Sequence, residues 1–205
     1  MHPNPAYRKT TRPEALAFAA ARGFGMLAVS AEGGPLLSHV PFLLSDEGGL
    51  AEFHLVRSNP IARLDGVAAV LAVTGPDGYV SPDWYGMDDQ VPTWNYVAVH
   101  LRGRLERMPE AAMHDLLERQ SAEYEARLAP KPPWTMDKTS GAVRDRLMRA
   151  ILPYRLVVEG VESTWKLSQN KPAAARLGAA EGLEEAGEGQ ETAALAALMR
   201  RAEPG

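Results

Sequence analysis

Between residues 24 and 105 the chain alternates short apolar runs with groups of turn-forming residues. The turn groups include Glu32-Gly33-Gly34, Asp46-Glu47-Gly48-Gly49 and Gly75-Pro76-Asp77-Gly78. Runs of this length between such turns are typical of an antiparallel β-meander. Because the open edges of a sheet invite pairing with other chains, we expect this sheet to close into a small barrel or to be covered by helices. The expected strands cover residues 25–30, 36–44, 50–55, 67–74, 79–81 and 93–105.

Helix signals stand on both sides of this region. Thr11 and Glu14 form a capping box, and Pro13 suits the first turn, which predicts a helix at residues 13–22. Apolar residues at helical spacing predict a second helix at 109–128. The remaining expected elements are a helix at 140–150, strand segments at 154–161 and 164–167 with a loop at Glu162-Ser163 between them, and a helix at 191–201.

Residues 178–190 are rich in Gly, Glu and Ala and are interpreted as a linker. We therefore expect an α+β, mainly β domain at residues 1–178. An acidic, alanine-rich C-terminal tail that is only partly ordered is expected at residues 179–205.

Composition excludes several classes of function. The chain has no cysteine, which removes disulfide scaffolds, thiolate metal sites and cysteine nucleophiles. Its five histidines include no pair at metal-ligand spacing, so no metal is expected. The apolar runs are far shorter than the ~20 residues of a membrane span, and the N-terminus lacks the apolar stretch of a secretion signal, so a cytoplasmic protein is expected.

The segment His54 to Leu64 is the first candidate site. Arg57 and Ser58 follow an expected strand, Asn59 can cap, and Pro60 can start a short helix. A guanidinium, a hydroxyl and the N–H groups of a helix start together suit a phosphate. The alternative is a capped surface helix preceded by a solvated arginine.

Two further segments are candidates. Five aromatic residues between positions 79 and 96 can form a shelf for a flat ring system, or else an aromatic corner of the core. The second segment, Ser163 to Pro172, places Lys166, Ser168 and Gln169 directly after an expected strand. Such polar residues suit contact with a polar ring edge, although they could equally cap the helix that begins near Pro172.

Four motifs in these segments resemble those of the PaiB-type FMN-binding negative transcriptional regulators. They are HLVRSNP (54–60), YVSPDWY (79–85), VPTWNYVAVH (91–100) and WKLSQNKP (165–172), supported by SHVPF (38–42). The resemblance covers about residues 1–178, and the order and spacing of the motifs match as well as their letters.

The resemblance implies an FMN-binding split β-barrel with flanking helices, of the kind found in pyridoxamine-phosphate-oxidase-like flavoproteins. It also implies a homodimer with FMN at the subunit interface. Arg57 and Ser58 would hold the FMN phosphate, with His54 and Leu55 beside them in the same motif. The strand that carries Ser38, His39, Val40 and Pro41 would line the isoalloxazine ring. The remaining implied contacts are Asn95, Tyr96, Lys166, Ser168 and Gln169, the last three from the partner subunit or the same loop.

Three functions remain open at this point. The family resemblance implies an FMN-binding regulator, and the net charge of −4 and the lack of a helix-turn-helix pattern indicate indirect action rather than DNA reading. The alternative is an FMN-dependent oxidoreductase that uses NAD(P)H or a small redox substrate. A third possibility is a haem-linked or other small-molecule binder with His39, His54 or His100 as axial ligand.

Overall fold

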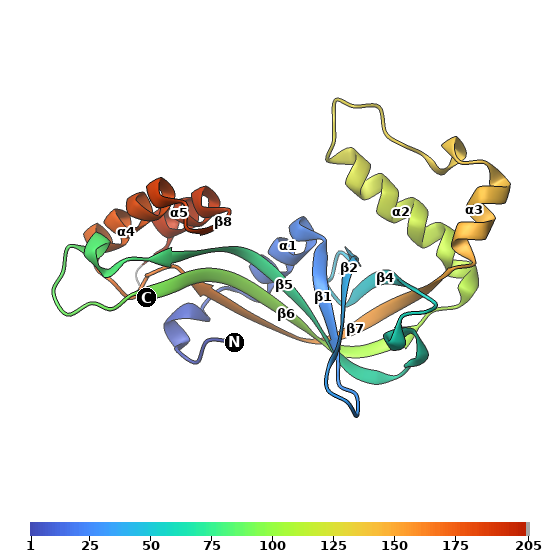
Figure 1. Cartoon of the computed structure of the whole chain (residues 1–205), viewed down its shortest axis with the longest axis horizontal. Coiled ribbons are helices and arrows are strands. Elements are labelled where there is room, and N and C mark those ends of the chain that lie inside the picture. Colours follow the sequence, from blue (N-terminus) through green and yellow to red (C-terminus); the bar gives the residue numbers. More distant parts are fainter. Residues whose placement is uncertain (204–205) are drawn as a thin grey trace. The chain divides into compact units, whose positions relative to one another are not determined.

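The computed structural model describes residues 1–203, which form five α-helices and eight strands (Figure 1). The helices are α1 (Arg12–Arg22), α2 (Met113–Ala126), α3 (Gly141–Met148), α4 (Ala173–Ala186) and α5 (Thr192–Arg201). The strands are β1 (Phe24–Val29), β2 (Leu36–Pro41), β3 (Leu43–Leu44), β4 (Leu50–Val56), β5 (Val67–Val80), β6 (Thr93–Arg107), β7 (Ile151–Lys166) and β8 (Gly189–Gln190). Among the described helices, none is long and apolar enough to cross a membrane.

The chain divides into two compact units. Unit 1 contains residues Met1–Phe18 and Val73–His100 and the described residues from Val161 onward. Unit 2 contains Ala19–Ala72 and Leu101–Gly160. Strands β5, β6 and β7 contribute residues to both units, because each runs across a boundary between the units.

The strands form one sheet with the order β2-β1-β5-β6-β7-β4-β3, and β8 pairs with β5. Strand β1 runs antiparallel to β2 and β5, and β4 runs antiparallel to β3 and β7. The register places Leu27 opposite Ser38 and Leu71, and Phe53 opposite Tyr154. These pairings confirm the expected antiparallel sheet.

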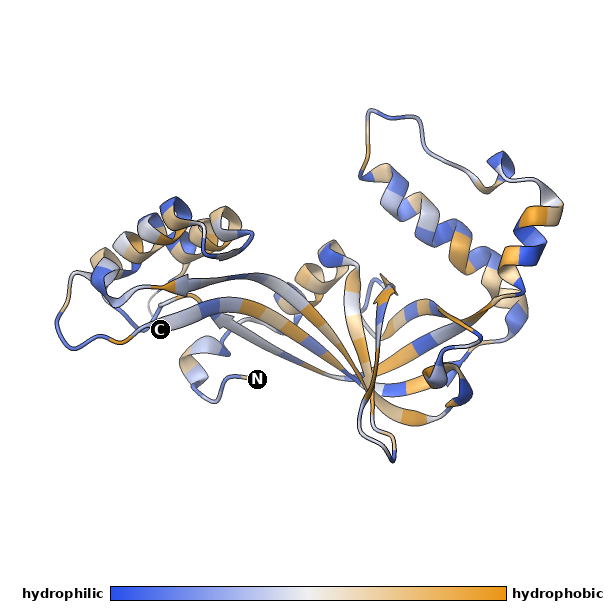
Figure 2. Ribbon diagram, in the orientation of Figure 1, coloured by the Kyte–Doolittle hydropathy of each residue, from blue (hydrophilic) through white to orange (hydrophobic). Residues whose placement is uncertain are grey.

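The core of unit 2 follows from the alternation of side chains along these strands. Hydrophobic and hydrophilic residues alternate along the strands in Figure 2, as expected when one face of each strand is buried. Leu27, Phe53, Leu71 and Tyr154 are fully buried. Strands β6 and β7 approach so closely at Gly103 that a Cβ there would lie 1.8 Å from the carbonyl oxygen of Val157. Only glycine fits at that position.

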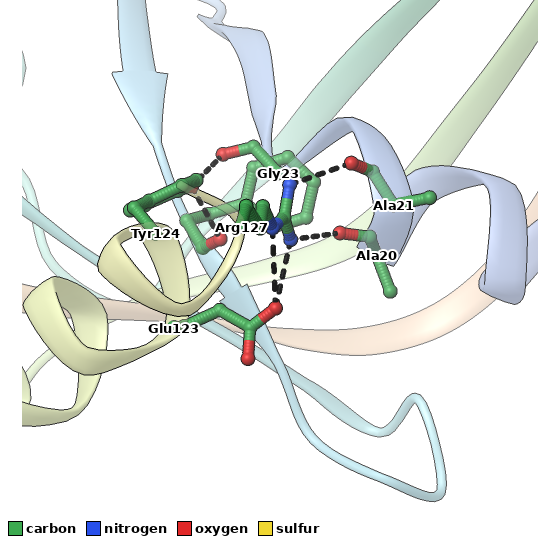
Figure 3. A network of polar contacts seen from close by, with 7 residues as sticks. Ala20, Ala21, Gly23, Glu123, Tyr124 and Arg127 are labelled. Carbon is green, nitrogen blue, oxygen red and sulfur yellow. Dashed lines mark hydrogen bonds and ion pairs between the residues drawn. The ribbon is translucent and has the colours of Figure 1, made fainter. Parts of the chain in front are cut away.

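Helix α1 begins as predicted, with the capping box in place. Glu14 accepts hydrogen bonds from the backbone N–H and the hydroxyl of Thr11, at 2.9 and 2.7 Å. At the other end, Arg127 of α2 donates to the carbonyl oxygens of Ala20 and Ala21, at 3.1 and 2.7 Å (Figure 3). A guanidinium at the last carbonyls of a helix also complements the negative end of its dipole. Helix α2 therefore fixes the C-terminal end of α1.

Gly23 completes this junction with a left-handed backbone, φ +60°. The Tyr124 hydroxyl donates to the carbonyl oxygen of Gly23 (Figure 3), and it lies 3.2 Å from the carbonyl oxygen of Phe42. A Cβ on Gly23 would lie 2.7 Å from that hydroxyl oxygen. The position therefore requires glycine for both its backbone angle and its contact with Tyr124.

The turn predicted at Gly75-Pro76-Asp77-Gly78 is wrong, because β5 is continuous through it. These glycines serve close packing instead. A Cβ on Gly75 would lie 2.5 Å from the Phe18 ring, and one on Gly78 would lie 2.6 Å from Leu183. Strand β8 pairs with the same stretch, with Gln190 opposite Asp77.

The loop predicted at Glu162-Ser163 is also wrong, since β7 runs unbroken to Lys166. Ser163 and Thr164 are buried, and Thr164 accepts a hydrogen bond from the backbone N–H of His2 at 3.0 Å. The strand continues through Ser163 and Thr164, and their polar side chains are buried in the interior of unit 1.

The linker predicted at residues 178–190 is in fact mostly helix, because α4 continues to Ala186. Its glycines face Trp84: a Cβ on Gly178 would lie 2.6 Å from the Trp84 carbonyl oxygen, and one on Gly182 would lie 2.5 Å from the ring. Helix α5 confirms the helix predicted at 191–201, and α4 and α5 lie side by side in Figure 1. The division at residue 178 between a domain and a tail stays a prediction, although α4 runs through it.

Helices α4 and α5 share one hydrophobic core with the strands of unit 1. Its fully buried members include Val80, Val97, Leu183, Leu195 and Met199. Arg176 donates to the carbonyl oxygen of Met199 at 2.9 Å and so ties the two helices together. The C-terminal segment is thus a packed part of unit 1.

The contact between α4 and Trp84 predicts that a glycine-to-alanine substitution in this helix lowers the stability of the protein instead of raising it. In an exposed helix Gly→Ala stabilises by about 1 kcal/mol through helix propensity. We expect Gly182→Ala instead to destabilise by about 1–3 kcal/mol, because the methyl group overlaps the Trp84 ring. Gly141→Ala is the control, since the nearest atom to its Cβ lies 3.9 Å away, and it should stabilise by about 0.4–1 kcal/mol. Urea unfolding of both variants measures the difference, and equal stabilisation by the two would contradict the packing described here.

Candidate functional site

The structure separates the thirteen predicted site residues into one group in each unit. In unit 2, Ser38, His39, Val40 and Pro41 lie on β2, His54 and Leu55 on β4, and Arg57 and Ser58 in the turn after β4. In unit 1, Asn95 and Tyr96 lie on β6, Lys166 ends β7, and Ser168 and Gln169 follow it.

The unit 2 group is organised by Asn59. Its side-chain nitrogen donates to the Ser38 hydroxyl at 3.0 Å, and its side-chain oxygen accepts from the Ile61 N–H at 2.9 Å. The expected short helix forms at Pro60–Arg63 with Asn59 as its cap. It has only four residues, and the Ala62 N–H is already bonded to the Asn59 carbonyl oxygen at 2.9 Å. Arg57 and Ser58, rather than a helix dipole, are therefore the groups that could hold a phosphate here.

Arg57 is held by two partners. Its Nε donates to the carbonyl oxygen of Arg149 at 2.6 Å, and its Nη2 donates to Glu110 at 2.5 Å. Arg107 donates to the other carboxylate oxygen of Glu110 at 2.9 Å. The hydrogen bond from Arg57 is the main cause of a lowered pKa at Glu110. The guanidinium is thus shown to bind an oxyanion, which is the chemistry that a phosphate requires.

The other members of the unit 2 group differ in exposure. Val40 and Leu55 are buried in the core. His54 is partly buried, and burial lowers its pKa while a hydrogen bond with Gln120 opposes the change. His39 is exposed and stacks on Phe24, with ring centroids 6.2 Å apart and an interplanar angle of 20°.

Three of the five residues in the unit 1 group line a cavity of about 260 Å³. Asn95, Lys166 and Ser168 all contribute to its wall, as do Tyr85 and Thr93. The Ser168 hydroxyl lies 2.9 Å from both the Tyr85 hydroxyl and the Asn95 side-chain nitrogen. These three buried polar side chains form one network, and the structure brings them together although they are far apart in the sequence.

The segment after β7 has two faces. Lys166, Ser168 and Asn170 line the cavity just described, whereas Trp165, Leu167 and Gln169 line a second cavity of about 550 Å³. This division arises where the chain leaves the extended conformation of β7, since residues 167–170 form bends and turns. It separates Gln169 from the other predicted residues of unit 1, and Tyr96 likewise is not part of the first cavity's lining.

Gln169 holds the local backbone. Its side-chain oxygen accepts from the Leu167 N–H at 2.8 Å, and its nitrogen donates to the carbonyl oxygens of Trp165 and Ala6 at 2.6 and 3.2 Å. Ser168 between them has a left-handed backbone, φ +59°. This conformation is strained for a residue with a Cβ, and such strain is typical of functional sites. The role of Gln169 in cofactor binding stays a prediction.

Two lysines and Asp89 supply the charges of the first cavity's lining. Lys166 contacts the Thr93 hydroxyl, and burial lowers the pKa of Lys166. Lys171 contacts the Gln90 side-chain oxygen and lies over the Tyr85 ring, 5.2 Å from its centroid. A cavity with two cations and several N–H and O–H donors suits an electron-rich carbonyl edge.

Sequence reasoning missed the contribution of the N-terminus. His2, Asn4 and Tyr7 line the same cavity. The ring centroids of His2 and Tyr7 lie 4.7 Å apart. Nothing in the first residues of the sequence signals this position, because it depends on a long-range hydrogen bond to Thr164. No group of residues suited to a metal ion occurs within residues 1–203.

Comparisons with known proteins agree with these features. A family model described as "Putative FMN-binding domain" matches residues 1–160. Protease synthase and sporulation protein PAI 2 of Bacillus subtilis (strain 168) is 30% identical over 172 residues, which is 82% of each chain.

Solved structures support the fold. The FAD and heme binding protein from Mycobacterium smegmatis has a TM-score of 0.56 at 18% identity, over 78% of this chain and 73% of its own. The conserved hypothetical protein Rv2991 from Mycobacterium tuberculosis has a TM-score of 0.56 at 17% identity, over 82% and 92%. With the antiparallel sheet described above, these similarities confirm the α+β split-barrel fold with flanking helices.

The chemistry of the residues in each unit fits an FMN cofactor, since Arg57 hydrogen-bonds a carboxylate in unit 2 and the cavity of unit 1 offers N–H and O–H donors. The family match extends over most of the chain and the identity to PAI 2 over more than four fifths of it. The chain therefore belongs to the PaiB-type family of FMN-binding regulators, whose cofactor is FMN.

Proposed function

We propose that this protein regulates gene expression indirectly through bound FMN, and does not read DNA itself. The observation that carries the proposal is the polar cavity of unit 1, which the WKLSQNKP motif builds with Asn95 and Tyr85. FMN, when bound, supplies one- and two-electron redox chemistry, and the protein supplies position and charge. A cytoplasmic location is part of the proposal, because a regulator of gene expression acts where genes are transcribed.

We assign the parts of FMN to the two groups of residues by their chemistry. Arg57 and Ser58 hold the phosphate, because a guanidinium and a hydroxyl are good phosphate donors. Asn95, Lys166 and Ser168 contact the pyrimidine edge of the ring, because they combine donors with a buried amide oxygen. The strand from Ser38 to Pro41 flanks the isoalloxazine.

We further propose that the protein is a homodimer with FMN at the subunit interface. An exposed apolar face on β1 and β2 supports this. Phe24 and Leu37 are each 54% exposed, and the register places them on the same face of the two strands as His39. Exposed apolar clusters of this kind mark interaction surfaces.

Titration with FMN tests the phosphate assignment. We expect Arg57→Ala to weaken FMN binding by about 1.5–3 kcal/mol, the usual value for a hydrogen bond to a charged group. Arg104→Ala is the matched control, because it removes an exposed arginine of the same unit that pairs with Glu106 and Glu159 outside the proposed site, and its affinity should match the wild type. Flavin fluorescence quenching measures both. Equal affinity of the Arg57→Ala variant and the wild type would place the phosphate elsewhere.

The lowered pKa of Lys166 predicts that this lysine lowers the free energy of unfolding near neutral pH, whereas we propose that it strengthens FMN binding. The unfolded chain holds this proton more tightly than the folded protein, so the unfolding free energy of the wild type rises with pH between the lowered pKa and the ordinary lysine value. Below that window the lysine is charged in both states, and the burial penalty is fully present.

We therefore expect Lys166→Met to be more stable than the wild type at pH 7 and to lose this advantage as the pH rises through the window. The variant should also bind FMN more weakly, since it lacks the ammonium donor. Urea unfolding at a series of pH values and FMN titration measure the two effects. A variant less stable than the wild type at pH 7 would show that burial of this lysine carries no penalty.

Direct DNA binding is testable separately. The net charge of −4 and a pI of about 5.8 oppose attraction to phosphate backbones. We expect no mobility shift of random duplex DNA at moderate salt, with or without FMN. A clear, salt-sensitive shift would overturn the indirect mode of regulation.

A further inference from the structure

Asn95 lines the unit 1 cavity and has an unused hydrogen-bond acceptor. The residue lies on β6, is 0% exposed and lines the cavity. Its Nδ2 donates to the Ser168 hydroxyl at 2.9 Å and to the Met199 sulfur at 3.4 Å. Its Oδ1 is buried and has no hydrogen-bond partner.

The orientation of this carboxamide follows from its neighbours. A thioether sulfur can accept a hydrogen bond but cannot donate one, so the amide nitrogen faces Met199. Both hydrogens of Nδ2 are then used, and Oδ1 is the atom left over. A buried acceptor without a partner destabilises the protein, and a bound ligand with a suitable donor would remove that penalty.

The surroundings hold Asn95 in this orientation. Ser168 contacts both Asn95 and Tyr85 and has the strained backbone angle of +59°. Tyr85 and Ser168 are 5% and 3% exposed. A network of buried and mutually bonded side chains fixes the amide before any ligand arrives, as a preorganised binding site requires.

The remaining groups of the cavity indicate what kind of ligand would use this acceptor. Lys166 and Lys171 can donate hydrogen bonds but cannot accept them. The side-chain oxygens of Thr93 and Gln90 are already engaged by these lysines. A ligand edge on which an N–H is flanked by carbonyl oxygens would therefore match one buried acceptor beside ammonium donors.

We infer that Asn95 Oδ1 accepts a hydrogen bond from an imide N–H of the ligand, which in FMN is the N3–H of the pyrimidine ring. The inference rests on the proposed function and adds to it the atoms through which Asn95 recognises this edge. Ser168 is a positioning residue, because it acts on the ligand through the orientation of Asn95.

A comparison of FMN with N3-methyl-FMN tests the inference, because the analogue replaces this N–H donor with a methyl group, and a clash of the methyl group alone would persist in a variant of unchanged side-chain volume. Fluorescence quenching titrations give the two dissociation constants for each variant. The wild type should prefer FMN by at least about tenfold, equivalent to one hydrogen bond of 1.4 kcal/mol. Asn95→Leu keeps the volume of the side chain but removes the acceptor, so it should bind FMN at least about tenfold more weakly and bind the two flavins equally.

Two further variants separate recognition from shape and folding. Ser168→Gly removes the hydroxyl and relieves the positive backbone angle, so the fold should be kept while the preference for FMN falls. Gln190→Leu changes an exposed amide that is not part of this cavity's lining and should keep the full preference. Thermal unfolding of each apo variant checks that it is folded.

The outcomes distinguish the inference from the proposed function. If the wild type binds FMN and N3-methyl-FMN equally, or if Asn95→Leu keeps the preference, Asn95 does not recognise N3–H and the inference is overturned while FMN binding stands. If the wild type binds neither flavin, the proposed function fails and the inference fails with it.

Discussion

The alternation of side chains along β5 and β6 is the constraint on which the rest of the structure depends. Both strands contribute to both units, and in each unit alternate residues of these strands enter the core. At the end of β7 the chain leaves the extended conformation, and there Lys166, Ser168 and Asn170 line one cavity while Trp165, Leu167 and Gln169 line another. The periodicity of the strands thus produces the hydrophobic interior, and the bend after β7 shapes the polar site.

Local signals were sufficient for much of the fold. The capping box at Thr11 and Glu14, the strand patterns before residue 57 and the helix at 192–201 were predicted because each depends on neighbours in the sequence. The errors concern glycines and polar residues whose partners are remote. Gly75 and Gly78 were interpreted as a turn and Gly178 and Gly182 as a linker, yet they make room for Phe18, Leu183 and Trp84. A sequence pattern cannot show which distant side chain needs that space.

The site was predictable to a similar extent. The chemistry of the WKLSQNKP motif indicated a polar contact surface, and Asn95, Lys166 and Ser168 do line one cavity. The division of this motif between two cavities accompanies the positive backbone angle of Ser168, which the sequence does not signal. The presence of His2, Asn4 and Tyr7 in the cavity depends on packing of the N-terminus. The two partners of Arg57, Glu110 and Arg149, lie 53 and 92 positions along the chain, beyond the reach of any local pattern.

Glu110 bridges Arg57 and Arg107 from a surface position, and this has a consequence for any anion that uses the Arg57 guanidinium. The carboxylate is an intramolecular competitor, tethered to the donors it occupies. An incoming anion must displace this carboxylate from the guanidinium. The measured affinity therefore reflects the difference between the free energies with which Arg57 binds the two oxyanions. Neutralising the Glu110 carboxylate should therefore raise the affinity for an anion, although loss of an ion pair usually lowers the stability of a protein.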